Sequence, residues 1–266
     1  MPVVEVTRDG DVRWLRLNRP DKLNALDWAT HDELRAALSE LADEPEVRAV
    51  VIAGNGRAFS AGADLNSRTR NDPDRDWARQ RHDAGRWQRL LDLLETVPQV
   101  TVASLHGHCI GGAALLAVAC DLRIAADDLQ VRIPELAIGI PLTWGGIPRL
   151  AREIGLPLAR DLVLTGRVLD APAALRAGFV QRVAAAAELD QDTRALVEEL
   201  RAMPSGPLAM TRSTFSALSR ELLGSGAWAD ADLLRWSTQE PATRALTADV
   251  QERFRPGAGP SATKDA

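Results

Sequence analysis

Val100-Thr-Val-Ala-Ser-Leu105 is followed after one residue by Gly107-His-Cys-Ile-Gly-Gly-Ala-Ala-Leu-Leu116. The first part is a short apolar run, which predicts a buried strand. The second part is rich in Gly and Ala and runs on to Cys120 without a charge, which predicts a tight turn and then a small-residue helix over 113–120. A strand, a glycine-rich turn and a helix in this order favour an α/β architecture.

The same order occurs earlier in the chain. Residues 47–53 read as a strand that ends in Gly54-Asn-Gly56, and Ala58-Phe-Ser-Ala-Gly-Ala-Asp-Leu65 follows that turn. Before it, alternating runs over 3–7 and 12–17 flank Asp9-Gly10, which predicts a β-hairpin. Asp27 then precedes apolar residues at helical spacing, which predicts a capped helix over 28–41.

The rest of the chain is mainly helical by its pattern. We expect a polar loop over 66–82 leading into a helix, then a strand over 122–125. From Ala151 onward helices dominate. We divide the chain into an α/β core over 1–200, a C-terminal helical layer over 201–256, and a tail over 257–266 whose composition is typical of disorder.

Two segments of small residues are candidates for binding an anion. Ala61-Gly62 and Gly111-Gly112 leave main-chain N–H groups uncovered. Either alone reads as a tight turn packed for steric reasons, but the pair favours one carbonyl oxygen held by two N–H groups. Losing one such donor typically costs about 10²–10³ in rate. A lone acid, Glu135, follows the second segment.

Composition excludes several classes of protein. With 45% hydrophobic and 26% charged residues among 266, the chain can bury a sizeable core, and a net charge of −5 argues against a nucleic-acid partner. Residues 103–120 approach the length of a membrane span but contain two histidines and the Gly111-Gly112 pair, so we expect no membrane segment. Cys109 and Cys120 lack metal-ligand spacing, so we expect no metal site and reduced, buried thiols. The N-terminal residues lack the features of a secretory signal, so we expect a cytoplasmic protein.

Five motifs in order and spacing from about residue 3 to residue 183 resemble the crotonase (enoyl-CoA hydratase/isomerase) family. They are Asn18-Arg-Pro-Asp-Lys-Leu-Asn-Ala-Leu26, the 58–65 segment, residues 107–121, Pro134-Glu135, and Gly145-Gly-Ile-Pro-Arg-Leu150. The resemblance implies a spiral of ββα repeats with a C-terminal helical layer that mediates trimerisation. It also implies an acyl-CoA thioester substrate, a homotrimer or a hexamer made of two trimers, and no metal or redox cofactor, because coenzyme A is part of the substrate.

The resemblance also implies roles for single residues. The two oxyanion donors match the N–H groups of Ala61 and Gly112. The family's CoA-contacting loop maps onto Lys22, Leu23 and Ala25, and the segment near the adenine and pantetheine maps onto Ala63, Asp64 and Leu65. Asp64 is equally well read as holding its own loop's backbone. Gly111, Leu115 and Trp144 complete the expected substrate contacts.

Leu115 departs from the family pattern. Hydratases of the family hold a water between two glutamates, and the first of these positions is Leu115 here, whereas the second is retained as Glu135. Losing an acceptor for that water costs on the order of 1–3 kcal/mol. A double-bond shift does not need the water, because one carboxylate can move a proton from C2 to C4. The pattern therefore favours an enoyl-CoA isomerase in which Glu135 is the shuttling base.

Two other functions remain open on the sequence. One is a slow or specialised hydratase, or another enolate-forming reaction of the family. The other is a catalytically weak acyl-CoA-binding protein. Trp144 also has two readings, because its ring could form a wall of the acyl pocket or simply pack against a helix.

Overall fold

The computed structural model describes residues 1–65, 76–224, 229–237 and 239–253. Its larger sheet has the strand order β1-β2-β3-β4-β6-β9. The strands are β1 (Val4–Asp9), β2 (Val12–Leu17), β3 (Ala49–Gly54), β4 (Val100–Leu105), β6 (Leu122–Ala126) and β9 (Arg182–Ala184). β1 and β2 are antiparallel, and every later neighbour is parallel.

The predicted N-terminal elements are confirmed. β1 and β2 pair with Asp9 opposite Val12, and Gly10 takes the positive φ of 61° that the hairpin turn requires. Helix α1 (Trp28–Glu40) begins at the predicted cap, where the Asp27 carboxylate accepts the Thr30 N–H at 2.8 Å. This bond satisfies one of the N–H groups that a helix start leaves without an intrahelical acceptor.

A second, smaller sheet was not expected as a separate unit. It has the order β5-β7-β8 and consists of β5 (His108–Ile110), β7 (Gln130–Arg132) and β8 (Leu169–Asp170). β4 feeds β5 and then helix α4 (Gly112–Val118), and β6 feeds β7 and then the short helix η4 (Glu135–Ile138). Each repeat thus places its first strand in the large sheet and its second in the small one, as a ββα spiral requires.

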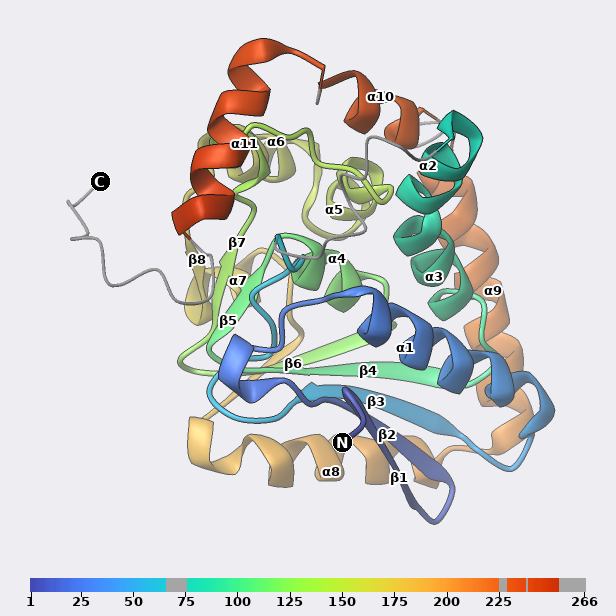
Figure 1. Cartoon of the computed structure of the whole chain (residues 1–266). Helices are drawn as coiled ribbons and strands as arrows, with labels where there is room; N and C mark the ends of the chain where they lie inside the picture. Colours follow the sequence, from blue (N-terminus) through green and yellow to red (C-terminus); the bar gives the residue numbers. More distant parts are fainter. Residues whose placement is uncertain (66–75, 225–228, 238, 254–266) are drawn as a thin grey trace.

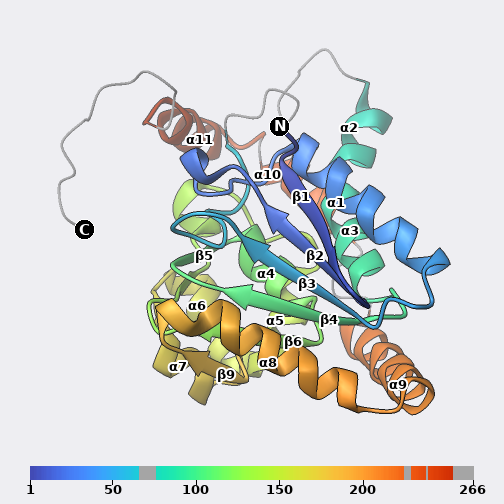
Figure 2. The ribbon, with the colours of Figure 1, turned by 90° about the horizontal axis from the view of Figure 1, so that it is seen from below.

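Both faces of the large sheet are buried. Along β3, Val50 and Ile52 belong to the main core, whereas Ala49 and Val51 belong to a second cluster on the opposite face. Helix α8 (Leu189–Ala202) covers that second face, while α1, α3 (Arg86–Leu94) and α4 lie on the other (Figure 1; Figure 2). Burying an aliphatic side chain stabilises the fold by about 1.5–3 kcal/mol. Because both faces of the sheet are covered, a strand such as β3 is apolar at nearly every position.

The remaining helices include several that lie above the large sheet in Figure 1. They are η1 (Pro20–Lys22), η2 (Leu41–Asp43), α2 (Trp77–Ala84), α5 (Gly146–Ile154), α6 (Leu156–Thr165), α7 (Ala171–Arg176), η5 (Ala186–Glu188), α9 (Ser205–Leu223), α10 (Asp230–Ser237) and α11 (Pro241–Arg253). α9 packs on α5, α10 on α2, and α11 on η4.

Two predicted segments lie outside the described residues. They are most of the polar loop, over 66–75, and the tail over 257–266. None of the helices within the described ranges combines the length and apolarity needed to cross a membrane. Cys109 and Cys120 are buried free thiols, as expected, and burial raises the pKa of both.

Candidate active site

Strand pairing in the small sheet brings the two glycine-rich segments together. Ser60 forms a parallel bridge with Cys109 of β5, through Ser60 N–H to the His108 carbonyl at 2.9 Å and Ile110 N–H to the Ser60 carbonyl at 3.1 Å. β7 pairs with β5 on the other side. Because these three segments run in parallel, the residues that follow each of them emerge at the same edge.

Gly62 marks the close approach of the two segments. Its φ is +83°, and a β-carbon there would collide with the Ile110 carbonyl and lie 3.6 Å from the Gly112 nitrogen. A side chain would therefore separate the segment at 61–63 from that at 111–112. Glycine at this position is what lets the two main chains lie side by side.

The structure corrects the assignment of the first N–H donor. The Ala61 N–H donates to the Leu23 carbonyl at 2.8 Å, so it is already engaged within the fold. Ala63 pairs with Leu26 in a parallel bridge. Its two hydrogen bonds are formed by the neighbours of Ala63, because Leu26 donates its N–H to the Gly62 carbonyl and Asp64 donates its N–H to the Leu26 carbonyl. In such a bridge the central residue turns its own N–H away from its partner strand. The Ala63 N–H has no acceptor among the described residues, which makes it the better candidate.

Gly112 is the first residue of α4. An N–H in the first turn of a helix has no intrahelical acceptor, and that of Gly112 finds no other acceptor in the described part of the chain. The preceding Gly111 has φ +54° and donates its N–H to the Arg132 carbonyl of β7 at 2.8 Å. The N–H of Gly112 thus meets one requirement of an oxyanion donor, because nothing in the described part of the chain accepts it.

Glu135 lies directly beside this turn. It opens η4 three residues after β7, and Gly139 closes the turn with a positive φ of 77°. A β-carbon on Gly111 would collide with Glu135 Oε1 and lie 3.3 Å from the Glu135 carboxyl carbon. The half-buried carboxylate thus sits against the main chain that leads into Gly112.

Leu115 supplies an apolar surface within α4. Its side chain is 1% exposed and packs on Gly146, where a β-carbon would lie 2.8 Å from Leu115 Cδ1 and 2.9 Å from Leu142 Cγ. Both of the readings made from the sequence, a core residue and a wall that excludes water, fit this position.

Trp144 lies over Gly112 of the second small-residue segment. The six-membered ring of its indole occupies the space that a β-carbon on Gly112 would need. The ring also stacks on Trp87 of α3, with centroids 4.8 Å apart and planes 13° from parallel. Trp144 therefore contacts both helix α3 and Gly112, so the two readings made from the sequence are compatible.

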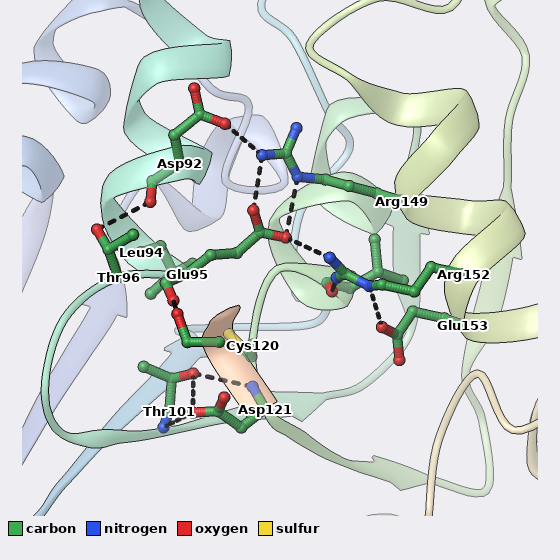
Figure 3. A network of polar contacts seen from close by, with 12 residues as sticks. Asp92, Leu94, Glu95, Thr96, Thr101, Cys120, Asp121, Arg149, Arg152 and Glu153 are labelled. Carbon is green, nitrogen blue, oxygen red and sulfur yellow. Dashed lines mark hydrogen bonds and ion pairs between the residues drawn. The ribbon is translucent and has the colours of Figure 1, made fainter. Parts of the chain in front are cut away.

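Charged side chains hold the turn at Trp144. Arg149 donates to the Trp144 carbonyl at 2.7 Å, and Asp230 of α10 accepts the Gly145 N–H at 2.7 Å. Arg149 is buried and also binds Glu95 and Asp92 of the neighbouring segment (Figure 3). Although burial opposes its charge, these carboxylates raise the pKa of Arg149 above its usual value.

The residues predicted to contact coenzyme A lie on two paired segments. The bridge between Leu26 and Ala63 places residues 22–26 beside residues 61–65. Arg19 joins the segments, because it forms an ion pair with Asp64 at 2.9 Å and another with Asp27 at 3.2 Å. Asp64 thus ties its loop to the segment that contains Arg19, and both of the readings made from the sequence stay predictions.

Arg19 and Asp230 are site residues that the sequence argument missed. Arg19 stands within the first family motif, so its position was a usable signal. Asp230 lies far along the chain from Gly145 and carries no local signal for this contact. Within the described ranges, no group of three or more His, Cys, Asp or Glu side chains could hold a metal ion.

This spiral α/β fold brings two small-residue segments and one carboxylate together, and a site of this class is suited to stabilising an oxyanion and moving a proton. A family model described as "Enoyl-CoA hydratase/isomerase" matches residues 7–252. The chain belongs to this family, also called the crotonase family, and its members act on acyl-CoA thioesters.

Relatives and solved structures agree with this assignment. The chain is 35% identical over 227 residues to "Probable enoyl-CoA hydratase echA8" of Mycobacterium tuberculosis, which covers 83% of this chain and 84% of the relative. It is 33% identical over 209 residues to carnitinyl-CoA dehydratase of Escherichia coli, covering 78% and 77%.

Among solved structures, a probable enoyl-CoA hydratase from Mycobacterium smegmatis matches with a TM-score of 0.80 at 29% identity, covering 94% of this chain and 98% of that one. An enoyl-CoA hydratase/isomerase from Mycobacterium paratuberculosis matches with a TM-score of 0.85 at 24% identity, covering 94% and 98%. The second likeness bears on the fold alone, and it matches the expected crotonase fold with its C-terminal helices.

Proposed function

We propose that this protein is an enolate-forming acyl-CoA enzyme in which the N–H groups of Ala63 and Gly112 hold the thioester oxygen. Glu135 is the base. The observation that carries this proposal is the position of the Glu135 carboxylate against Gly111, one residue from the donor Gly112. A base beside an oxyanion hole can remove a proton at the carbon next to the carbonyl while the negative charge is stabilised.

The preferred reaction is the shift of a double bond from C3 to C2 of a 3-enoyl thioester. Glu135 removes a proton from C2, the charge spreads over the dienolate and its oxygen, and the same proton returns at C4. No second acid and no bound water is needed. Leu115 supports this reading, because the position three residues after Gly112 then carries no second carboxylate that could protonate the dienolate.

Hydration of a 2-enoyl thioester is the second candidate. The names of the relatives favour it over isomerisation, since several of them are called enoyl-CoA hydratases. Leu115 argues against an efficient version of it, because a leucine cannot accept a hydrogen bond from the attacking water.

One experiment separates these reactions. Purified protein is incubated with a 3-enoyl-CoA or a 2-enoyl-CoA, and Glu135→Gln is assayed in parallel. We expect isomerisation of the 3-enoyl-CoA, lowered by at least about 10² in the variant because an amide cannot act as the base. Isomerisation that persists unchanged in the variant would contradict the single-base mechanism.

The other outcomes assign the remaining functions. Fast hydration of the 2-enoyl-CoA would establish a hydratase and overturn the argument from Leu115. Retained binding of acyl-CoA without turnover of either substrate would establish a catalytically weak acyl-CoA-binding protein.

We also propose that the protein assembles as a homotrimer or as a hexamer of two trimers. Helix α9 supports this, because Phe215 is 62%, Leu218 49% and Leu222 60% exposed in the isolated chain. Their spacing of three and four residues places them on one face of the helix. Apolar surface of this kind is typical of a contact between subunits.

A further inference from the structure

The position of Trp144 also bears on the acyl group that the site accepts. A ring that lies where a β-carbon of Gly112 would be is close to any oxygen that the Gly112 N–H holds. The acyl chain is bonded to the same carbonyl group as this oxygen, so its first carbon atoms must pass near the indole. This step rests on the proposed function, in which Gly112 binds the thioester oxygen.

The ring is held in place by other aromatic side chains. Trp144 stacks on Trp87, and the edge of His31 contacts Trp87 with centroids 5.2 Å apart. Trp87 and His31 are 5% and 2% exposed, so neither can move aside without opening the core. Stacked and edge-on aromatic pairs add to the stability gained from burial alone.

The main chain beneath the ring is held as well. Trp144 has φ +63°, a value that is unusual for a residue with a large side chain. Its carbonyl is bound by Arg149 of α5, and the next N–H is bound by Asp230 of α10. Two charged side chains from different helices thus fix both groups of one peptide bond, so the indole cannot easily swing away.

We propose that Trp144 is a specificity-determining residue that restricts the substrate to acyl-CoA thioesters with a compact acyl group. Trp87 supports the ring from behind, and Arg149 and Asp230 act as positioning residues for the turn. A long or branched acyl group would need the volume that the indole fills, whereas a short planar enoyl group can lie along its face.

Binding of unreactive saturated thioesters tests this without depending on the reaction. The dissociation constants of butyryl-CoA and decanoyl-CoA are measured by titration calorimetry for the wild type, Trp144→Ala and Trp144→Leu. We expect the wild type to favour butyryl-CoA, and Trp144→Ala to shift the ratio toward decanoyl-CoA by about tenfold or more. Each methylene that gains apolar contact is worth about fourfold in affinity. Trp144→Leu keeps apolar volume in the core and is expected to shift the ratio in the same direction by less.

The matched control is Ile147→Ala, at an exposed position near the start of α5, the helix that follows Trp144. It should leave the ratio of the two dissociation constants unchanged. A wild type that prefers decanoyl-CoA would overturn the proposal. The proposal would also be overturned if the ratio of the two dissociation constants stayed unchanged in a Trp144 variant that keeps the wild-type melting temperature. Failure of the wild type to bind any acyl-CoA would instead refute the proposed function.

Discussion

Leu115 and Glu135 occupy the two positions where family hydratases place glutamates, and only one of them can act as an acid or base. Leu115 is 1% exposed and packs on Gly146 at the start of α5, so the difference lies in the core. Restoring a carboxylate there would bring back an acceptor for water at the cost of burying a charge.

Replacing Leu115 therefore tests the chemistry directly. We expect Leu115→Glu to gain measurable hydration of a 2-enoyl-CoA and to lower the free energy of unfolding by a few kcal/mol. Leu115→Gln is the control, because glutamine is similar in size to glutamate but cannot act as an acid. Equal hydration by both variants would show that the second carboxylate is not what the wild type lacks.

The choice between Ala61 and Ala63 as oxyanion donor can be tested by removing one N–H at a time with proline. Ala63→Pro is expected to lower kcat by about 10²–10³, the usual effect of losing an oxyanion donor. Ala61→Pro removes the bond to the Leu23 carbonyl, so we expect it mainly to lower the free energy of unfolding by about 0.5–1.5 kcal/mol. Steady-state kinetics and thermal unfolding distinguish these outcomes, and the reverse pattern would return the donor role to Ala61.

At the scale of elements, α10 reaches the site from the far end of the chain. Asp230 binds the Gly145 N–H, and Asp232 on the same helix forms an ion pair with Arg81 of α2 at 2.8 Å. Burial raises the pKa of Asp230, and its hydrogen bond from Gly145 offsets this only in part. The hydrogen bond from Arg81 lowers the pKa of Asp232.

These two shifts predict opposite responses to pH. The folded protein keeps the Asp230 proton to a higher pH than the unfolded chain, so the free energy of unfolding falls as pH rises from about 4 through the raised pKa. Asp230→Asn has no such proton, and its melting temperature should rise relative to the wild type over this window. Above it, the difference should stay constant.

Asp232→Asn is the matched control on the same helix. The folded-state pKa of Asp232 is lowered, so its contribution to stability is present above its ordinary pKa and is lost as pH falls through the lowered value. The melting temperature of Asp232→Asn should therefore fall relative to the wild type as pH rises. If the melting temperatures of both variants changed with pH in the same direction relative to the wild type, the burial of Asp230 against the turn at Trp144 would be contradicted.

At the scale of the whole molecule, the exposed apolar face of α9 predicts an assembly. We expect light scattering after size-exclusion chromatography to give a trimer or hexamer for the wild type. Phe215→Glu combined with Leu222→Glu should shift it toward the monomer, because charges on this face cannot be buried between subunits. Ser213→Glu, an exposed change on another face of α9, is the control. A monomeric wild type would contradict the proposed assembly.

The sequence alone determined the strands β1 to β4 and β6, the N-terminal hairpin, the Asp27 cap and the family, but it missed the short strands β5, β7, β8 and β9. These features depend on residues close together in the chain, where periodicity, turn residues and short motifs act directly. It also singled out Glu135 and Leu115, because both stand in motifs of fixed spacing.

Only the tertiary structure decided which of the candidate N–H groups are already bonded within the fold. Ala61 and Ala63 are two residues apart in the same motif, and the difference between them comes from pairing with residues 23–26. The stacking of Trp144 on Trp87 and the bond from Gly145 to Asp230 likewise join segments far apart in the chain. Such contacts have no local signal, because they exist only after the sheet and the C-terminal helices have packed.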